Sequence, residues 1–247
     1  GAVAVVARPP GIGHPDHPYA ARELVRTVLA MAEVRVVRRW PRASAPQVPP
    51  EPSEVPTPIA GRRDIDLVAV GASTGGPVVI QTFLKSLPED FSVPILIVQH
   101  MAGGFIQGFV EWLAQTCNRP VLLGGHGVLM VRGHIYVAPD GHQMGVDARG
   151  RIRLSPPTPE NGFAPSVSYL LRSVAEVYGL RTAAILLSGM GTDGAVELKH
   201  LRDSGALTFA QDEETAVIYG MPGEARRLGA AQYILPPQAI AKTLTSL

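Results

Sequence analysis

A serine flanked by glycines stands between two apolar runs of the chain. Residues 70–77 read VGASTGGP, and residues 71–75 fit the pattern G-x-S-x-G with Ser73 at its centre. In this pattern the serine occupies a strained turn between a strand and a helix. Small neighbours let a carbonyl group approach, and free N–H groups can stabilise an oxyanion. These residues therefore favour a nucleophile at Ser73.

Phosphate binding is the second chemistry that this glycine-rich stretch could support. A dinucleotide site requires G-x-G-x-x-G and an acidic residue about 20 residues further on, at the end of the second strand. Here Ser73 takes the middle glycine position, and the second apolar run ends in Gln99 and His100. No Gly-Lys-Ser/Thr follows, so the Walker pattern also fails. A tight turn without chemistry remains the alternative on this motif alone.

Two further strand ends offer the partners that a nucleophilic serine needs. His100 follows the run PILIVQ, and Asp193 lies in LLSGMGTDGA, residues 186–195, between a buried strand and a helix. The carboxyl ends of parallel strands line one crevice, so His100 is placed to act as base for Ser73 and Asp193 to orient the imidazole. Taken singly, His100 could be a helix cap or a core histidine, and Asp193 a helix N-cap. The order Ser, His, Asp differs from that of α/β-hydrolases, so the motif does not imply their fold.

Other polar residues fit structural roles better than catalysis. His134 begins an apolar run, and Asp140 and His142 lie in the turn after it, so we expect structural or substrate-rim positions for them. His14 and His17 lack a third ligand of matching type, and no metal site is predicted.

The composition is that of a globular protein without an electrostatically defined partner. The chain has 247 residues, 46% of them hydrophobic, and a formal net charge of +1, which disfavours a nucleic-acid interface. Its single cysteine, Cys117, is expected to be a small core or surface residue and indicates a reducing cytosol. No segment approaches the roughly 20 apolar residues of a membrane span, and no signal peptide is evident. A cytoplasmic protein is therefore expected.

The elements that must position these residues follow from the apolar pattern. From Asp64 on, runs of strand length and runs of helix length alternate. This alternation predicts an α/β fold: a doubly wound, mostly parallel sheet with helices on both faces. Residues 133–140, 142–148 and 151–155 interrupt it and are predicted to form short antiparallel strands beside the parallel core.

The start of the chain is predicted to be a separate unit. Residues 39–63 are crowded with prolines and read as a stiff linker. Residues 1–38 hold one strand and one helix, which cannot bury their own apolar faces, and residues 64–247 form the main domain. The first unit either docks on the main domain or ends an upstream α/β domain. The absence of an initiator methionine favours the second interpretation.

Several segments together resemble the catalytic domain of the chemotaxis protein-glutamate methylesterases, the CheB family. They span nearly all of residues 64–247 in the expected order: GASTGGP, VQHM followed by Gly104 and Phe105, GHIYVAPDGHQM, APSVSYLLRSVAE, LLSGMGTDGA and AQDEETAVIYGMPGEA. Each segment is longer than a chance motif, so the resemblance is specific.

The resemblance implies hydrolysis of γ-glutamyl methyl esters on the cytoplasmic helices of chemoreceptors, with release of methanol, and deamidation of receptor glutamines. It implies no cofactor. Ser73 would be the nucleophile, His100 the base and Asp193 the orienting carboxylate. The N–H of Thr74 and the backbone around Met190 would stabilise the oxyanion. A related hydrolase acting on another ester or amide, and a signalling scaffold with little turnover, remain alternatives.

The chain departs from the family pattern at three positions. Residues 1–38 are similar to the end of a receiver domain, the response-regulator half of this family, where Arg8 replaces a lysine. That replacement puts normal phosphorylation by a histidine kinase, through a full receiver domain, in doubt. Ala164 and Ser168 stand where the family commonly has arginine and aspartate. If those charges contact the receptor, substrate preference has shifted.

Overall fold

A computed structural model describes four stretches of the chain: residues 9–11, 13–32, 64–157 and 162–246. The helix predicted near the start is confirmed as α1 (His17–Ala32). The first predicted strand and the proline-rich segment 39–63 lie outside the described residues. Within the described stretches, no helix is both long and apolar enough to cross a membrane.

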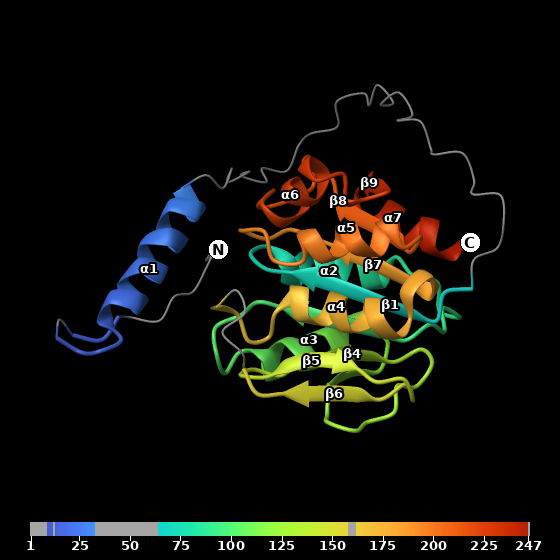
Figure 1. The fold of residues 1–247 in the computed structure, drawn as a ribbon, viewed down its shortest axis with the longest axis horizontal. Coiled ribbons are helices and arrows are strands. Elements are labelled where there is room, and N and C mark those ends of the chain that lie inside the picture. The colour runs from blue at the N-terminus through green and yellow to red at the C-terminus, as the bar shows by residue number, and fades with distance from the viewer. Residues whose placement is uncertain (1–8, 12, 33–63, 158–161, 247) are drawn as a thin grey trace, which may run out of the picture.

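A seven-stranded sheet forms the centre of the fold (Figure 1). Its order is β3-β4-β2-β1-β7-β8-β9, and every neighbouring pair is parallel. Because β2 lies on one side of β1 and β7 on the other, the strand order reverses at β1, where open α/β sheets form their ligand crevice. The strands are β1 (Leu67–Ala72), β2 (Ile95–Gln99), β3 (Val121–Leu123), β4 (Ile135–Val137), β7 (Thr182–Leu186), β8 (Leu207–Gln211) and β9 (Tyr233–Leu235).

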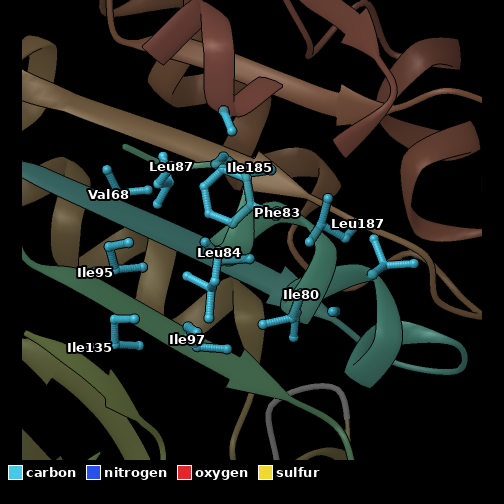
Figure 2. Close-up of a cluster of buried hydrophobic side chains, with 14 of the residues drawn as sticks. Val68, Ile80, Phe83, Leu84, Leu87, Ile95, Ile97, Ile135, Ile185 and Leu187 are labelled. Carbon is cyan, nitrogen blue, oxygen red and sulfur yellow. The ribbon is translucent and has the colours of Figure 1, made fainter. Parts of the chain in front are cut away.

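Helices cover both faces of this sheet. Val68 and Val70 of β1 enter the core beneath α2, α3 and α7, and Leu67 and Ala69 enter the opposite core beneath α4, α5 and α6, as the two-residue period of a strand requires. Figure 2 shows the first core, where Phe83 of α2 packs on the sheet. The predicted doubly wound, mostly parallel sheet is confirmed. The helices are α2 (Gly76–Lys85), α3 (Ile106–Cys117), α4 (Val167–Val177), α5 (Ala195–Asp203), α6 (Met221–Arg227) and α7 (Pro237–Thr245).

The antiparallel region is smaller than the sequence predicted. Strands β5 (Gln143–Val146) and β6 (Ile152–Ser155) form the expected antiparallel pair. The first of the three predicted antiparallel strands is instead β4, which joins the main sheet parallel to β2 and β3. Ile135, Tyr136 and Val137 are all buried, because both faces of an interior parallel strand are covered. The predicted antiparallel assignment of residues 133–140 is therefore wrong.

Candidate active site

Ser73 lies directly after β1, in the turn that leads into α2. Its N–H donates to the carbonyl of Ser188 (3.0 Å), in the loop after β7, and its carbonyl accepts from the N–H of Gly76 (2.9 Å). Gly75 between them has a φ of 81°, in the left-handed region that favours glycine. A Cβ on Gly189 would lie 2.8 Å from the Cβ of Ser73, so the loop after β7 packs closely against the serine. The predicted strand, turn and helix around Ser73 are present.

His100 and Asp193 are in direct contact. The Nε2 atom of His100 lies 2.9 Å from Oδ2 of Asp193, and both side chains are almost fully buried. An ionised carboxylate can only accept a hydrogen bond, so Nε2 carries the proton and Nδ1 carries the lone pair. Nδ1 is buried and has no hydrogen-bond partner among the residues that the structure describes. The nitrogen left free to take a proton is therefore Nδ1, whereas the serine proteases use Nε2.

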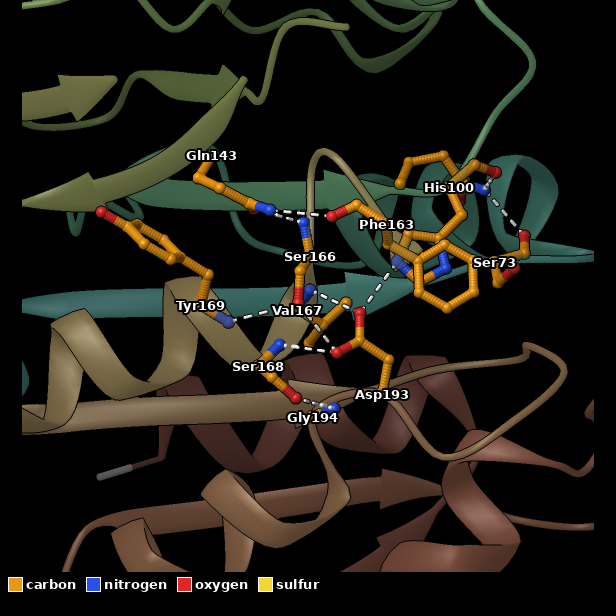
Figure 3. Close-up of polar contacts among 11 residues, drawn as sticks. Ser73, His100, Gln143, Phe163, Ser166, Val167, Ser168, Tyr169, Asp193 and Gly194 are labelled. Carbon is orange, nitrogen blue, oxygen red and sulfur yellow. Dashed lines mark hydrogen bonds and ion pairs between the residues drawn. The ribbon is translucent and has the colours of Figure 1, made fainter. Parts of the chain in front are cut away.

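Asp193 is also held by the first turn of α4 (Figure 3). Its Oδ1 accepts from Oγ of Ser166 (3.0 Å) and from the N–H of Ser168 (2.9 Å). Its Oδ2 accepts from the N–H of Val167 (2.7 Å) as well as from His100. Asp193 thus caps a helix, as the structural alternative supposed, but the helix is α4. The N-cap of α5, which follows Asp193 in the chain, is Gly194.

These contacts keep Asp193 ionised. Burial alone raises the pKa of its carboxyl. The hydrogen bond and charge of His100, together with hydrogen bonds from Ser168, lower that pKa by more than burial raises it. The net result is a pKa well below the usual range for aspartate. A permanent negative charge at Asp193 orients His100 and favours its protonated form during a reaction.

Lowering the pH should therefore destabilise the parent chain more than an Asp193→Asn variant. The folded pKa of Asp193 lies below its ordinary value of about 3.9. The stability that the ionised group contributes is complete above about pH 5 and is lost as the pH falls through about 4 toward the folded pKa. Urea unfolding of both proteins at about pH 7 and about pH 3 measures this. The difference in unfolding free energy between the parent and Asp193→Asn should be smaller at about pH 3 than at about pH 7. An equal difference at both pH values would contradict the prediction.

Gln99 joins the serine loop to the histidine loop. Its side chain is 1% exposed, and its Nε2 donates to the carbonyls of Ser73 (2.7 Å) and His100 (2.8 Å). The N–H of His100 in turn donates to the carbonyl of Ala72 (3.0 Å). A Cβ on Gly76 would overlap Oε1 of Gln99. Glycine at the start of α2 is thus needed for this bridge to form.

Gly76→Ala should lower both activity and stability. The added methyl group displaces the Gln99 amide, so we expect turnover to fall about 10- to 100-fold and unfolding free energy to fall by about 1–3 kcal/mol. Gly108→Ala is the matched control, because Gly108 lies inside α3 with open space around its Cβ position. Gly108→Ala should leave activity unchanged and raise the free energy of unfolding by about 0.5–1 kcal/mol. Equal effects of the two substitutions would contradict the role of Gln99.

Phe163 covers one face of the His100 imidazole. Its ring is stacked on that of His100, with centroids 4.2 Å apart and planes inclined by 5°. The guanidinium carbon of Arg26, on α1, lies 5.9 Å from the centroid of Phe163. No local sequence pattern indicates that Phe163, far along the chain, stacks on His100.

The backbone of Thr74 and Met190, expected to stabilise an oxyanion, lies on the two loops around Ser73. Thr74 follows the serine, and its carbonyl accepts from Oγ of Ser188 (2.7 Å). Met190 follows Gly189, which packs on Ser73. Within the described stretches of the chain, neither N–H donates a hydrogen bond. Their role as oxyanion donors stays a prediction.

Two departures from the family pattern lie beside the triad. Ser168 is 3% exposed. Its N–H donates to Asp193, and its Oγ accepts from the N–H of Gly194 (2.9 Å). Ser168 therefore supports Asp193 from a buried position, and the suggested shift in substrate preference stays a prediction. Ala164 is half-buried, and its carbonyl accepts from the N–H of Gly141 (3.2 Å).

The remaining candidates occupy structural positions. Asp140 accepts from the N–H of Gly104 (2.7 Å), which ties the loop after β2 to the loop after β4. The Nδ1 of His134 and that of His142 each lie against a carbonyl two residues earlier. Cys117 is buried, and burial raises the pKa of its thiol. Among the described residues, no group of three His, Cys, Asp or Glu side chains could hold a metal ion.

Comparisons with known proteins agree on one family. The family model described as CheB methylesterase matches residues 68–244. The chain is 52% identical to the protein-glutamate methylesterase/protein-glutamine glutaminase of Nitrosospira multiformis, covering 100% of this chain and 69% of that protein. It is 51% identical to a protein of the same name from Syntrophus aciditrophicus, covering 100% and 70%. The crystal structure of the Thermotoga maritima CheB methylesterase catalytic domain matches with a TM-score of 0.70 and 33% identity, over 73% of this chain and 97% of that one.

Proposed function

Because the chain belongs to the CheB methylesterase family, we propose that Ser73, His100 and Asp193 are the catalytic residues of a serine hydrolase acting on protein side chains. The chain is an enzyme with protein-glutamate methylesterase and protein-glutamine glutaminase activity. The observation that carries the residue assignment is the bond between Nε2 of His100 and Asp193, which leaves Nδ1 as the proton acceptor.

In the first half of the reaction, Oγ of Ser73 attacks the ester carbonyl of a methylated glutamate and its proton moves to Nδ1 of His100. The carbonyl oxygen becomes an oxyanion, which the N–H groups of Thr74 and Met190 stabilise. When the intermediate collapses, the C–O bond to the methoxy group breaks. The proton on Nδ1 passes to the departing oxygen, and methanol leaves. A glutamyl ester of Ser73 remains.

Water completes the second half of the reaction. Nδ1 of His100 takes a proton from water, whose oxygen attacks the glutamyl ester and forms a second oxyanion. The bond to Oγ of Ser73 then breaks, Oγ recovers its proton from His100, and the free glutamate carboxyl leaves. A glutamine substrate follows the same steps with ammonia as the first leaving group. The negative charge of Asp193 stabilises the imidazolium in every step.

The substrate that we propose for this activity is the cytoplasmic helical region of a chemoreceptor, which makes the cytoplasm the expected compartment. The catalytic unit comprises residues 64–247. The linker 39–63 precedes it, and residues 1–38 end a receiver-like unit. On α1 the apolar side chains Val25, Val28 and Leu29 are all more than half exposed, so this helix does not bury its apolar face against the catalytic unit. A histidine kinase would act through the full receiver domain.

The experiment that tests the function is methanol release from a methylated chemoreceptor cytoplasmic fragment. Release by the parent chain, together with labelling of Ser73 by a fluorophosphonate, supports the methylesterase assignment. Labelling without release would move the assignment to another ester or amide substrate. Receptor binding with neither labelling nor release would favour a signalling scaffold, because a fluorophosphonate reacts only with an activated serine.

A further inference from the structure

A buried glutamine outside the triad holds the segment that contacts two of its members. Gln143 begins β5 and is fully buried. Its Nε2 donates to the carbonyl of Phe163 (2.7 Å), and its Oε1 accepts from the N–H of Ser166 (2.8 Å). One amide thus spans residues 163–166, using its donor on one end and its acceptor on the other.

Each end of this span continues to a catalytic side chain (Figure 3). At one end, the ring of Phe163 stacks on the imidazole of His100 at 4.2 Å. At the other, Oγ of Ser166 donates to Oδ1 of Asp193 (3.0 Å) and accepts from the N–H of Tyr169 (3.4 Å). Phe163 thus supports His100, and Ser166 supports Asp193. The side chain of Gln143 fixes the spacing between these two supports.

We infer that Gln143 is a positioning residue of the triad, which acts through Phe163 on His100 and through Ser166 on Asp193. This inference rests on the proposed function of the triad. The physical argument is one of precision, since displacing catalytic groups by about 1 Å can lower turnover by about two orders of magnitude. Without the amide, the segment keeps its covalent path but loses the contacts that fix its two ends relative to each other.

The test compares Gln143→Met with Ser173→Ala. Methionine keeps the volume of the side chain and removes both hydrogen bonds. Ser173 also joins α4 to β5 through two bonds of its Oγ, one from the N–H and one to the carbonyl of Val146 (2.8 and 3.2 Å). Its bonds do not involve residues 163–166, so Ser173→Ala is a matched loss of the same kind of contact. Thermal unfolding of both variants shows whether their stability losses are comparable.

Two readouts report on the triad itself. The rate of fluorophosphonate labelling measures the reactivity of Ser73 without a receptor substrate, and methanol release separates kcat from KM. In Gln143→Met we expect labelling and kcat to fall about 10- to 100-fold, with KM changed less than about twofold. In Ser173→Ala both rates should stay within about threefold of the parent. Equal reductions in the two variants, or no reduction in Gln143→Met, would overturn the inference.

A double-mutant cycle then tests the route of the effect. Phe163→Leu removes the ring that stacks on His100. If Gln143 acts through Phe163, Phe163→Leu should slow labelling less in the Gln143→Met background than in the parent. Added to Ser173→Ala, it should have its full effect. Full additivity with Gln143→Met would sink the inference. If Gln143→Met does not fold, Gln143→Asn takes its place, because it keeps the amide but withdraws it by one methylene.

The outcome also distinguishes this inference from the proposed function. A parent chain that is neither labelled nor active would reject the triad and the role of Gln143 together. A labelled, active parent with an unaffected Gln143→Met variant would reject the role of Gln143 alone.

Discussion

Ser73→Ala should lower methanol release by about 10⁴-fold or more, because the loss of the nucleophile leaves only binding and oxyanion stabilisation. Both steps of the proposed reaction pass through Oγ of Ser73, so we expect no other side chain to restore the covalent route. Fluorophosphonate labelling should disappear at the same time. Methanol release from the methylated receptor fragment, measured with parent and variant at equal concentration, checks both statements.

Ser86→Ala is the control for this experiment. Ser86 caps the other end of α2, where its Oγ donates to the carbonyl of Thr82 (2.8 Å). Ser86 ends the helix that begins just after the Ser73 turn, and it lies away from the strand ends. Replacing it should therefore leave methanol release within about twofold of the parent. Residual turnover of Ser73→Ala near the parent level would show that the nucleophile lies elsewhere.

Asp193→Asn is expected to have the second largest effect. Turnover should fall by about 10⁴-fold, as the corresponding change does in serine proteases, because the amide can hold His100 in the wrong tautomer. Unfolding free energy should also fall by about 1.5–3 kcal/mol, since the donors of Ser166, Val167 and Ser168 lose a charged acceptor. Methanol release and urea unfolding at neutral pH measure the two effects separately.

Asp203→Asn provides the comparison at the opposite end of α5. Asp203 pairs with Lys199 on the surface, and exposed pairs of this kind contribute about 0.3–0.5 kcal/mol. Its substitution should leave turnover unchanged. A stability loss without loss of turnover in Asp193→Asn would mean that the carboxylate only caps α4 and does not orient His100.

The placement of the three candidate residues could be predicted because the topology puts them at neighbouring strand ends. Ser73, His100 and Asp193 follow β1, β2 and β7, which are adjacent in the sheet. The sequence pattern of buried strand, short loop and helix is enough to locate such positions. The strand β4 was assigned to the wrong sheet because three residues carry too little pattern to separate a parallel interior strand from an antiparallel one.

The supporting residues were not predictable in the same way. Ser166 carries a recognisable signal, as a serine directly ahead of an apolar helical run, but nothing in that signal indicates that it bonds Asp193. Gln99, Gln143 and Phe163 show no local pattern at all. Their roles depend on how loops separated by 20 to 60 or so residues meet in the folded chain, which only tertiary packing decides.

Because Asp193 accepts hydrogen bonds from the start of α4, its position depends on whether that part of the helix is folded. If the carboxylate rotates away from His100, the buried N–H groups of Val167 and Ser168 lose their acceptor. If the first turn of α4 frays, the carboxylate loses most of its support. The assembled triad and the intact helix start are thus one cooperative unit in the sense of native-state fluctuations. Opening of this turn should therefore lower turnover even where the parallel sheet stays folded.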